Sequence, residues 1–180
     1  MKRSQLEHVI RAAATITQDD DIVVIGSQAV LGQFPDAPEE LCVSDEADLY
    51  PRHRPERSDL IDGSIGEGSP FHITFGYYAQ GVGVTTATLP RGWETRLVPV
   101  RNERTRDATG WCLEVHDLVI SKLAAGREKD MVFTRAAARH GLVRETELRA
   151  RLDDLVVDER VRAAIAVRIS RAFDASPGDD

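Results

Sequence analysis

The sequence is poor in cysteine and has no long apolar run. Its two cysteines, Cys42 and Cys112, are too few for a disulfide scaffold and lack the paired spacing of metal ligands. No window approaches the roughly 20 apolar residues that span a bilayer, and the first residues are charged and amphipathic, unlike a signal peptide. These absences favour a cytoplasmic protein that does not enter a membrane.

An excess of basic residues is also missing. The formal net charge is −7, so the molecule as a whole would repel a polyanion. Binding of nucleic acid would need a local basic surface, for which the second half offers Arg127, Lys129, Arg135, Arg139, Arg144, Arg149 and Arg151. Their acidic neighbours favour a solvated helix face of mixed charge instead. A DNA-binding regulator is therefore disfavoured.

Hydrophobic periodicity predicts an α+β (α/β) fold. Apolar positions at helical spacing predict a helix over residues 4–16, and the β-branched run 22–25 predicts a strand buried on both faces. An acidic strand is expected over residues 43–49, with Glu46 and Asp48 toward its end. Residues 71–101 are rich in Thr, Val, Tyr and Gly, which predicts two or three more strands. These are 71–78, 83–87 and 96–100, with a further short strand at 111–114.

The rest of the chain has a helical pattern. Helices are expected over residues 118–125, capped by Asp117, and over 127–140, 144–155 and 159–173. Together these patterns predict a mixed β-sheet flanked by helices in residues 1–113. A C-terminal helical region packed on that core would follow in 114–174, and a disordered tail in 175–180.

Two carboxylates in the acidic strand carry the chemical argument. Because strand side chains alternate between faces, Glu46 and Asp48 point the same way and Asp45 points to the other face. Carboxylates side by side repel unless a cation lies between them, and Mg²⁺ suits this arrangement because it binds carboxylate oxygens and keeps sites for water and phosphate. The alternative is that both residues face solvent on an edge strand, where charge prevents aggregation.

Gly26 and Ser27 are predicted at a strand-to-helix junction upstream of these acids. A glycine there lets the backbone approach a ligand closely, and the start of a helix offers unpaired N–H groups to an anion. A phosphate cradle that faces a metal site provides what nucleotidyl transfer needs. This combination favours the metal site over the solvent-facing alternative.

A Gly-Ser pair at a strand end, a loop and a strand with two alternate acids resemble the signature of the DNA polymerase β-like nucleotidyltransferase superfamily. The resemblance implies a nucleotidyltransferase-like fold. It also implies that Gly26 and Ser27 bind the phosphates of a nucleotide, and that Glu46 and Asp48 are catalytic residues that hold Mg²⁺.

Residues 114–130 resemble the lysine-bearing helix of the AbiEii-like toxin branch or of a close relative. The resemblance implies that Lys122 contacts the triphosphate and that Asp130 completes the acidic site or orients the lysine. The implied activity is Mg²⁺-dependent transfer of a nucleotide from an NTP to an RNA, often tRNA, or to a protein. The implied biological role is that of a toxin with an antitoxin protein as its partner.

Two departures from the family pattern keep a second function open. Glu46 stands where the family usually has aspartate, and its extra methylene moves the carboxylate outward by about one bond length. The predicted strand 71–78 has no acidic residue, although many catalytic members place their general base there. His72 in this segment could line the cleft, and His53 could meet phosphate after the acidic strand. The alternative function is a non-catalytic relative that acts as a nucleotide sensor or protein-binding module.

Overall fold

The structure is a computed structural model that describes residues 1–174, so the tail predicted in 175–180 lies outside the described residues. Two units are distinguished. The first comprises Met1–Thr86 and Arg96–Glu114, and the second comprises Ala87–Thr95 and the helical part of the chain from Val115 onward. None of the helices in residues 1–174 combines the length and the apolar character needed to cross a membrane.

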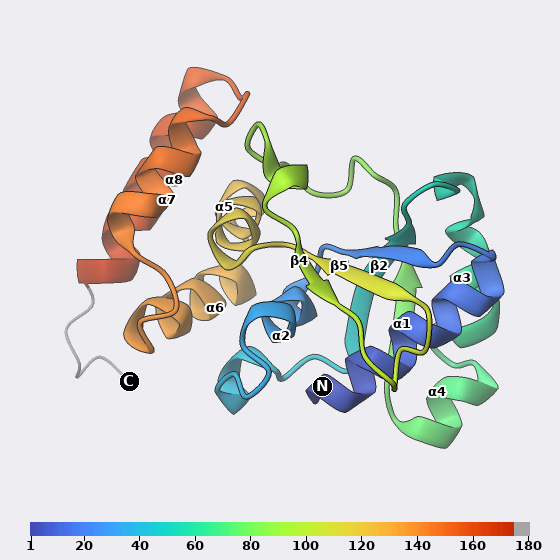
Figure 1. Ribbon diagram of the computed structural model, residues 1–180. Coiled ribbons are helices and arrows are strands. Elements are labelled where there is room, and N and C mark those ends of the chain that lie inside the picture. Colours follow the sequence, from blue (N-terminus) through green and yellow to red (C-terminus); the bar gives the residue numbers. More distant parts are fainter. Residues whose placement is uncertain (175–180) are drawn as a thin grey trace. The chain divides into compact units, whose positions relative to one another are not determined.

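The first unit is built on a mixed sheet (Figure 1). Within residues 1–174, this sheet has five strands in the order β3-β2-β1-β5-β4. In chain order the strands are β1 (Asp21–Val24), β2 (Glu46–Pro51), β3 (Tyr78–Gly81), β4 (Val98–Val100) and β5 (Thr109–Cys112). β2 is antiparallel to β1 and parallel to β3, while β5 is parallel to β1 and antiparallel to β4. The predicted α+β class with a mixed sheet flanked by helices is confirmed.

Helices and short 3₁₀ turns of the first unit lie before and between these strands. The helices are α1 (Arg3–Thr17), α2 (Val30–Gln33), α3 (Asp59–Ile65) and α4 (Pro70–Phe75), and the 3₁₀ turns are η1 (Ser27–Ala29), η2 (Glu39–Leu41) and η3 (Pro55–Arg57). The apolar stripe that predicts α1 is buried, with Leu6, Val9, Ile10, Ala13 and Ala14 among its buried residues.

α1 packs against one face of the sheet. A Cβ on Gly110 of β5 would lie 2.3 Å from Cδ1 of Ile10, so the helix contacts the strand backbone directly at this point. Val24 lies beside Cys112 and Leu49 in the register of β5 and β2, which places these side chains on the same face as Gly110. The residues of β2 that alternate with Leu49 therefore point to the other face of the sheet.

The second unit consists of helices and one 3₁₀ turn. These are η4 (Trp93–Thr95), α5 (Val115–Ala125), α6 (Glu128–Arg139), α7 (Glu145–Asp153) and α8 (Glu159–Asp174). The four helices agree with the predicted ones to within a few residues. Asp117 is not the cap before α5, because it lies in the first turn of that helix. Its buried carboxylate is 3.1 Å from Nε of Arg151.

The predicted strand over residues 71–78 is wrong. This segment forms α4, whose start is fixed by Ser69, which accepts a hydrogen bond from the backbone of His72, and by Pro70 in the first turn. Gly76 ends the helix in the left-handed conformation, with φ 75°. Strand β3 begins only at Tyr78, and residues 83–87 form no strand.

The acidic strand is also displaced from its predicted bounds. It begins at Glu46 rather than at residue 43, and it extends to Pro51. Glu46 and Asp48 therefore lie at the start of β2 rather than at its end. Because β2 is antiparallel to β1, its start lies beside the end of β1, where Gly26 follows.

Candidate functional site

β2 places Glu46 and Asp48 on one face of its pleat. The alternating residues Ala47 and Leu49 are fully buried, whereas both acidic residues are partly exposed. Since the side chains of a strand alternate between its faces, both carboxylates project from the side of β2 opposite to Ala47 and Leu49.

Gly26 lies directly against Asp48. The backbone N–H of Ile25 donates to the carbonyl oxygen of Asp48 at 3.0 Å, which aligns the end of β1 with this residue. A Cβ on Gly26 would lie 1.9 Å from Oδ2 of Asp48 and 2.9 Å from its Cβ. The backbone of Gly26 is extended, with φ −81° and ψ −173°. Glycine is therefore required here for space and not for backbone conformation.

Ser27 begins the turn that follows. The helical segment after Gly26 consists of the 3₁₀ turn η1, which continues into the four-residue helix α2. The side chain of Gln28 in η1 is buried and donates to the carbonyl oxygen of Ser44 at 3.0 Å, which ties the turn to the residues before β2. A phosphate at this corner would meet the N–H groups of one short turn rather than the dipole of a long helix.

A tyrosine that the sequence pattern does not single out holds Glu46. The hydroxyl of Tyr78 donates to Oε2 of Glu46 at 2.7 Å. This hydrogen bond, together with burial and the negative charges of Glu46, Glu67 and Asp48, raises the pKa of Tyr78. The phenol is therefore a protonated donor at neutral pH.

Strand β3, which pairs with β2 on the side away from β1, has no acidic residue. In the parallel pairing of β2 with β3, Glu46 lies opposite Tyr78 and Asp48 lies opposite Gln80. Side chains that lie opposite each other in neighbouring strands share a face, and the side chain of Gln80 is exposed. Gln80 is therefore the neighbour of Asp48 on β3, where a third carboxylate would complete the acidic set.

In the second unit, Lys122 of α5 and Asp130 of α6 form a buried ion pair. Nζ of Lys122 lies 3.3 Å from Oδ1 of Asp130 and 4.5 Å from the centre of the Phe133 ring. Nε of Arg127 lies 2.7 Å from Oδ2 of Asp130. Lys122 is 8% exposed and Asp130 is 0% exposed. Asp130 thus contacts Lys122 directly, which is the geometry needed by a residue that orients the lysine.

Burial and charge act in opposite directions on this pair. Burial lowers the pKa of Lys122, and the charge of Asp130 offsets that effect only in part. Burial would raise the pKa of Asp130, but the hydrogen bond from Arg127 and the charges of Lys122 and Arg127 outweigh it and lower the pKa. Asp130 is therefore ionised at neutral pH.

A second group of possible metal ligands lies at the opposite end of β1 and β2. Asp19, Asp21 and His53 offer ligand atoms within 4.8 Å of one another. The carboxylate of Asp19 already accepts hydrogen bonds from the backbone N–H groups of His53 at 2.6 Å, Arg54 at 3.0 Å and Asp21 at 3.1 Å. Nδ1 of His53 lies 3.1 Å from the same carboxylate. His53 thus faces Asp19. The hydrogen bonds of this group fix the backbone that follows β2 to the residues before β1.

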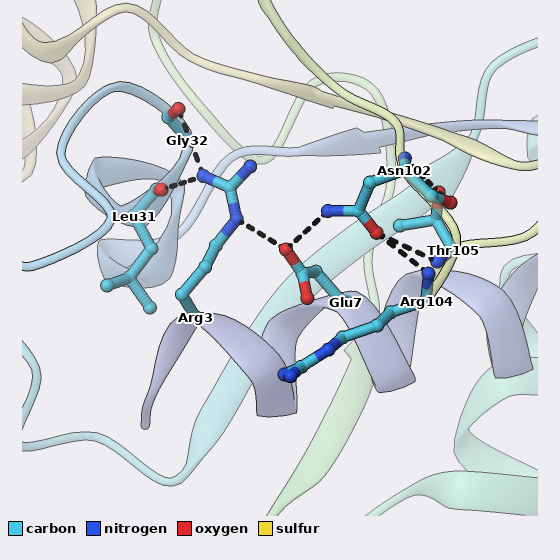
Figure 2. A network of polar contacts seen from close by, with 7 residues as sticks. All are labelled: Arg3, Glu7, Leu31, Gly32, Asn102, Arg104 and Thr105. Atoms are coloured by element: carbon cyan, nitrogen blue, oxygen red, sulfur yellow. Dashed lines mark hydrogen bonds and ion pairs between the residues drawn. The ribbon is translucent and has the colours of Figure 1, made fainter.

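A cavity of about 840 Å³ opens in the first unit beside the start of α1. Figure 2 shows the polar network there: Oε1 of Glu7 accepts from Nε of Arg3 at 3.0 Å and from Nδ2 of Asn102 at 2.8 Å. Arg3 also donates to the backbone carbonyls of Leu31 and Gly32. The network joins α1 to α2 and to the turn after β4. The residues that line this cavity do not include the predicted site residues.

The mixed sheet flanked by helices is consistent with a nucleotidyltransferase-like fold. A family model described as "Nucleotidyltransferase of unknown function (DUF6036)" matches residues 4–168, and the chain belongs to this family. The curated proteins and the solved structures yield no match to this chain. The family supports the resemblance to the nucleotidyltransferase superfamily, whereas the AbiEii-like toxin branch stays a prediction.

Proposed function

We propose that the protein is an Mg²⁺-dependent nucleotidyltransferase that moves a nucleotide from an NTP to an RNA or protein acceptor. The observation that carries this proposal is the packing of the Asp48 carboxylate against Gly26, with Glu46 on the same side of β2. Family membership supports the transferase class.

The donor set at Glu46 and Asp48 fits Mg²⁺. Both side chains are partly exposed carboxylates from one side of a strand, and Mg²⁺ in nucleotide enzymes binds one or two carboxylates together with waters and phosphate oxygens. When bound, the ion would hold the phosphates and lower the pKa of the attacking hydroxyl. We assign the group around Asp19 a structural role, because three backbone N–H groups donate to that carboxylate.

Gly26 and Ser27 of the first unit would bind the phosphates of the NTP. The absence of a side chain on Gly26 leaves room for the Asp48 carboxylate, and Ser27 would offer its hydroxyl and the N–H groups of its turn to phosphate. The contact of Lys122 with the triphosphate is carried over from the family resemblance. Asp130 would hold the lysine side chain for this contact, in keeping with their 3.3 Å separation.

The acceptor and the biological role rest on resemblance alone. That resemblance favours tRNA as the acceptor, and a cytoplasmic toxin with an antitoxin protein as partner. A net charge of −7 requires tRNA to meet a local basic surface.

A specific observation favours the second candidate function, a nucleotide sensor or protein-binding module without transferase activity. Gln80 is the neighbour of Asp48 on β3, and an amide cannot act as a general base for an acceptor hydroxyl. A catalytic member would have to obtain that base from another residue or from the acceptor itself.

The deciding experiment incubates the protein with labelled NTPs, Mg²⁺ and total tRNA, or with total protein as acceptor. Transfer of label by the wild type and its loss in Asp48→Asn would support the enzyme. Calorimetry of NTP binding with and without Mg²⁺ separates the alternatives. Metal-dependent binding without transfer would favour the sensor, and absence of metal-dependent binding would refute the proposed metal site.

A further inference from the structure

The side chain of Glu46 is more flexible than an aspartate side chain would be at this position. A glutamate has one more rotatable bond, so its partly exposed carboxylate can adopt several orientations relative to Asp48. Fixing such a side chain at the moment of ligand binding costs conformational entropy. A contact that fixes it beforehand would remove part of this cost.

The structure contains such a contact in Tyr78. The register of β2 and β3 places this residue directly opposite Glu46. Its hydroxyl lies 2.7 Å from Oε2 of Glu46, a length typical of a strong hydrogen bond to an ionised carboxylate. The bond engages one oxygen of the carboxylate and leaves Oε1 to other ligands.

Tyr78 is itself held by a neighbour. Its ring centre lies 4.6 Å from that of His72, with the ring planes tilted by 45°. Nδ1 of His72 accepts a hydrogen bond from the backbone N–H of Gly68 at 3.0 Å, so the imidazole is anchored to the loop before α4. A connected set of contacts therefore runs from Gly68 through His72 and Tyr78 to Glu46.

We propose that Tyr78 is a positioning residue that orients the Glu46 carboxylate for the metal ion. This inference rests on the proposed function, because it assigns Glu46 as a ligand. Hydrogen bonds to a ligating carboxylate fix its orientation, and their loss typically weakens metal binding by about 10-fold to 100-fold. The hydrogen bond from the tyrosine would offset the extra conformational freedom that the longer side chain gives Glu46.

Tyr78→Phe tests the proposal because it removes one hydroxyl and keeps the ring against His72. Tyr77→Phe is the matched control, since the neighbouring tyrosine precedes β3 and its hydroxyl lies 2.7 Å from Nδ1 of His8 in α1. Binding of Mn²⁺ is measured by water-proton relaxation, alone and with ATP. The dissociation constant is expected to rise by about 10-fold in Tyr78→Phe and to stay within about 2-fold of the wild type in Tyr77→Phe.

A double-mutant cycle separates positioning from a general structural role. Shortening the side chain in Glu46→Asp withdraws the carboxylate from the phenol, so Tyr78→Phe added to Glu46→Asp should change the Mn²⁺ dissociation constant little. Thermal melting of all variants is recorded in parallel. Equal losses of Mn²⁺ affinity from Tyr78→Phe in both backgrounds would overturn the positioning role.

Different experimental results would overturn this inference and the proposed function. A wild-type protein that binds no Mn²⁺ with ATP would refute the metal site and the positioning role together. A wild-type protein that binds Mn²⁺, with Tyr78→Phe unchanged, would overturn only the role of Tyr78. In label transfer, the proposal expects Tyr78→Phe to raise the Mg²⁺ concentration needed for half-maximal rate by about 10-fold, with a smaller change at saturating Mg²⁺.

Discussion

The carboxylate of Asp48 lies so close to Gly26 that a Cβ on that glycine would stand 1.9 Å from Oδ2. Side-chain atoms cannot approach to that distance, so any substitution at Gly26 must displace the carboxylate or the end of β1. The strand that carries Asp48 and the turn that follows β1 therefore depend on each other at a single contact.

Gly26→Ala is expected to weaken metal-dependent NTP binding by at least about 10-fold, because the added methyl group displaces a ligand from its position. Overpacking of this kind also lowers the free energy of unfolding, by about 1–3 kcal/mol. Calorimetry with Mg²⁺ and ATP, together with urea denaturation, measures both effects.

Gly63→Ala is the matched control for this substitution. A Cβ on Gly63 would have no atom within 4 Å, and the residue lies inside α3. Alanine there should leave NTP binding unchanged and raise the free energy of unfolding by about 0.5–1 kcal/mol. Wild-type NTP binding by Gly26→Ala would contradict the importance of the contact with Asp48.

The buried pair of Lys122 and Asp130 predicts that two substitutions lower the free energy of unfolding by different amounts. Asp130→Ala leaves the ammonium of Lys122 buried without this carboxylate, which costs about 3–5 kcal/mol of the free energy of unfolding. Lys122→Met should cost less, because Arg127 still contacts Asp130 at 2.7 Å and the thioether chain fits an apolar site beside Phe133.

Urea denaturation of both variants checks this order, and Lys122→Met then tests the predicted contact with the triphosphate. A folded Lys122→Met protein that binds NTP as the wild type does would show that the lysine serves stability alone. Equal destabilisation by both substitutions would contradict the expected difference.

The environment of Asp19 predicts how the stability of the first unit changes in acid. Burial would raise the pKa of Asp19, but hydrogen bonds from His53 and Asp21 outweigh this effect and lower it. A carboxyl group with a lowered pKa stabilises the folded state above the unfolded-state pKa of about 3.9, and this contribution disappears as the pH falls through the folded-state pKa.

Asp19→Asn is expected to lower the free energy of unfolding by about 1–3 kcal/mol at pH 7, because hydrogen bonds to a charged acceptor are lost. The difference between variant and wild type should shrink as the pH falls below about 4. Binding of Mn²⁺ should not change. Loss of Mn²⁺ binding in Asp19→Asn would show that the group formed by Asp19, Asp21 and His53 is a metal site.

Local periodicity was sufficient to predict most of the helices and the shared face of Glu46 and Asp48. Alternation along a strand is a property of the strand itself, so the orientation of these two residues does not depend on their neighbours. The segment 71–78 was predicted wrongly because its aromatic and β-branched residues favour a strand, whereas Ser69, Pro70 and Gly76 cap a helix around them. The caps prevailed over the propensity of the residues between them.

Tyr78 could not be connected to Glu46 from the sequence. The two residues are 32 positions apart, and their pairing requires the register of two parallel strands, which the chain between them and the packing of α3 and α4 determine. Once β3 is known to begin at Tyr78, the period of two places Tyr78 and Gln80 toward the acidic residues. The contact of Lys122 with Asp130 likewise depends on how two helices pack.

The burial of the Cys112 thiol predicts that the folded state loses stability in alkaline solution. Burial raises the pKa of its thiol to about 12, whereas in the unfolded chain the thiol titrates near 8.5. Above about pH 8.5 the unfolded state therefore loses a proton that the folded state retains, and the folded state is destabilised by about 1.4 kcal/mol per pH unit until the folded thiol also titrates. Urea denaturation at pH 7.5, 9 and 10 should show this decline.

Cys112→Ala isolates this contribution, because its free energy of unfolding lacks the thiol's dependence on pH. Its deficit relative to the wild type should be largest at pH 7.5 and should shrink or reverse by pH 10. Cys42→Ala is the control. Because Cys42 is only partly buried, the difference in free energy of unfolding between Cys42→Ala and the wild type should vary less with pH. A Cys112→Ala deficit that is the same at pH 7.5 and at pH 10 would show that the buried thiol titrates alike in the folded and unfolded states.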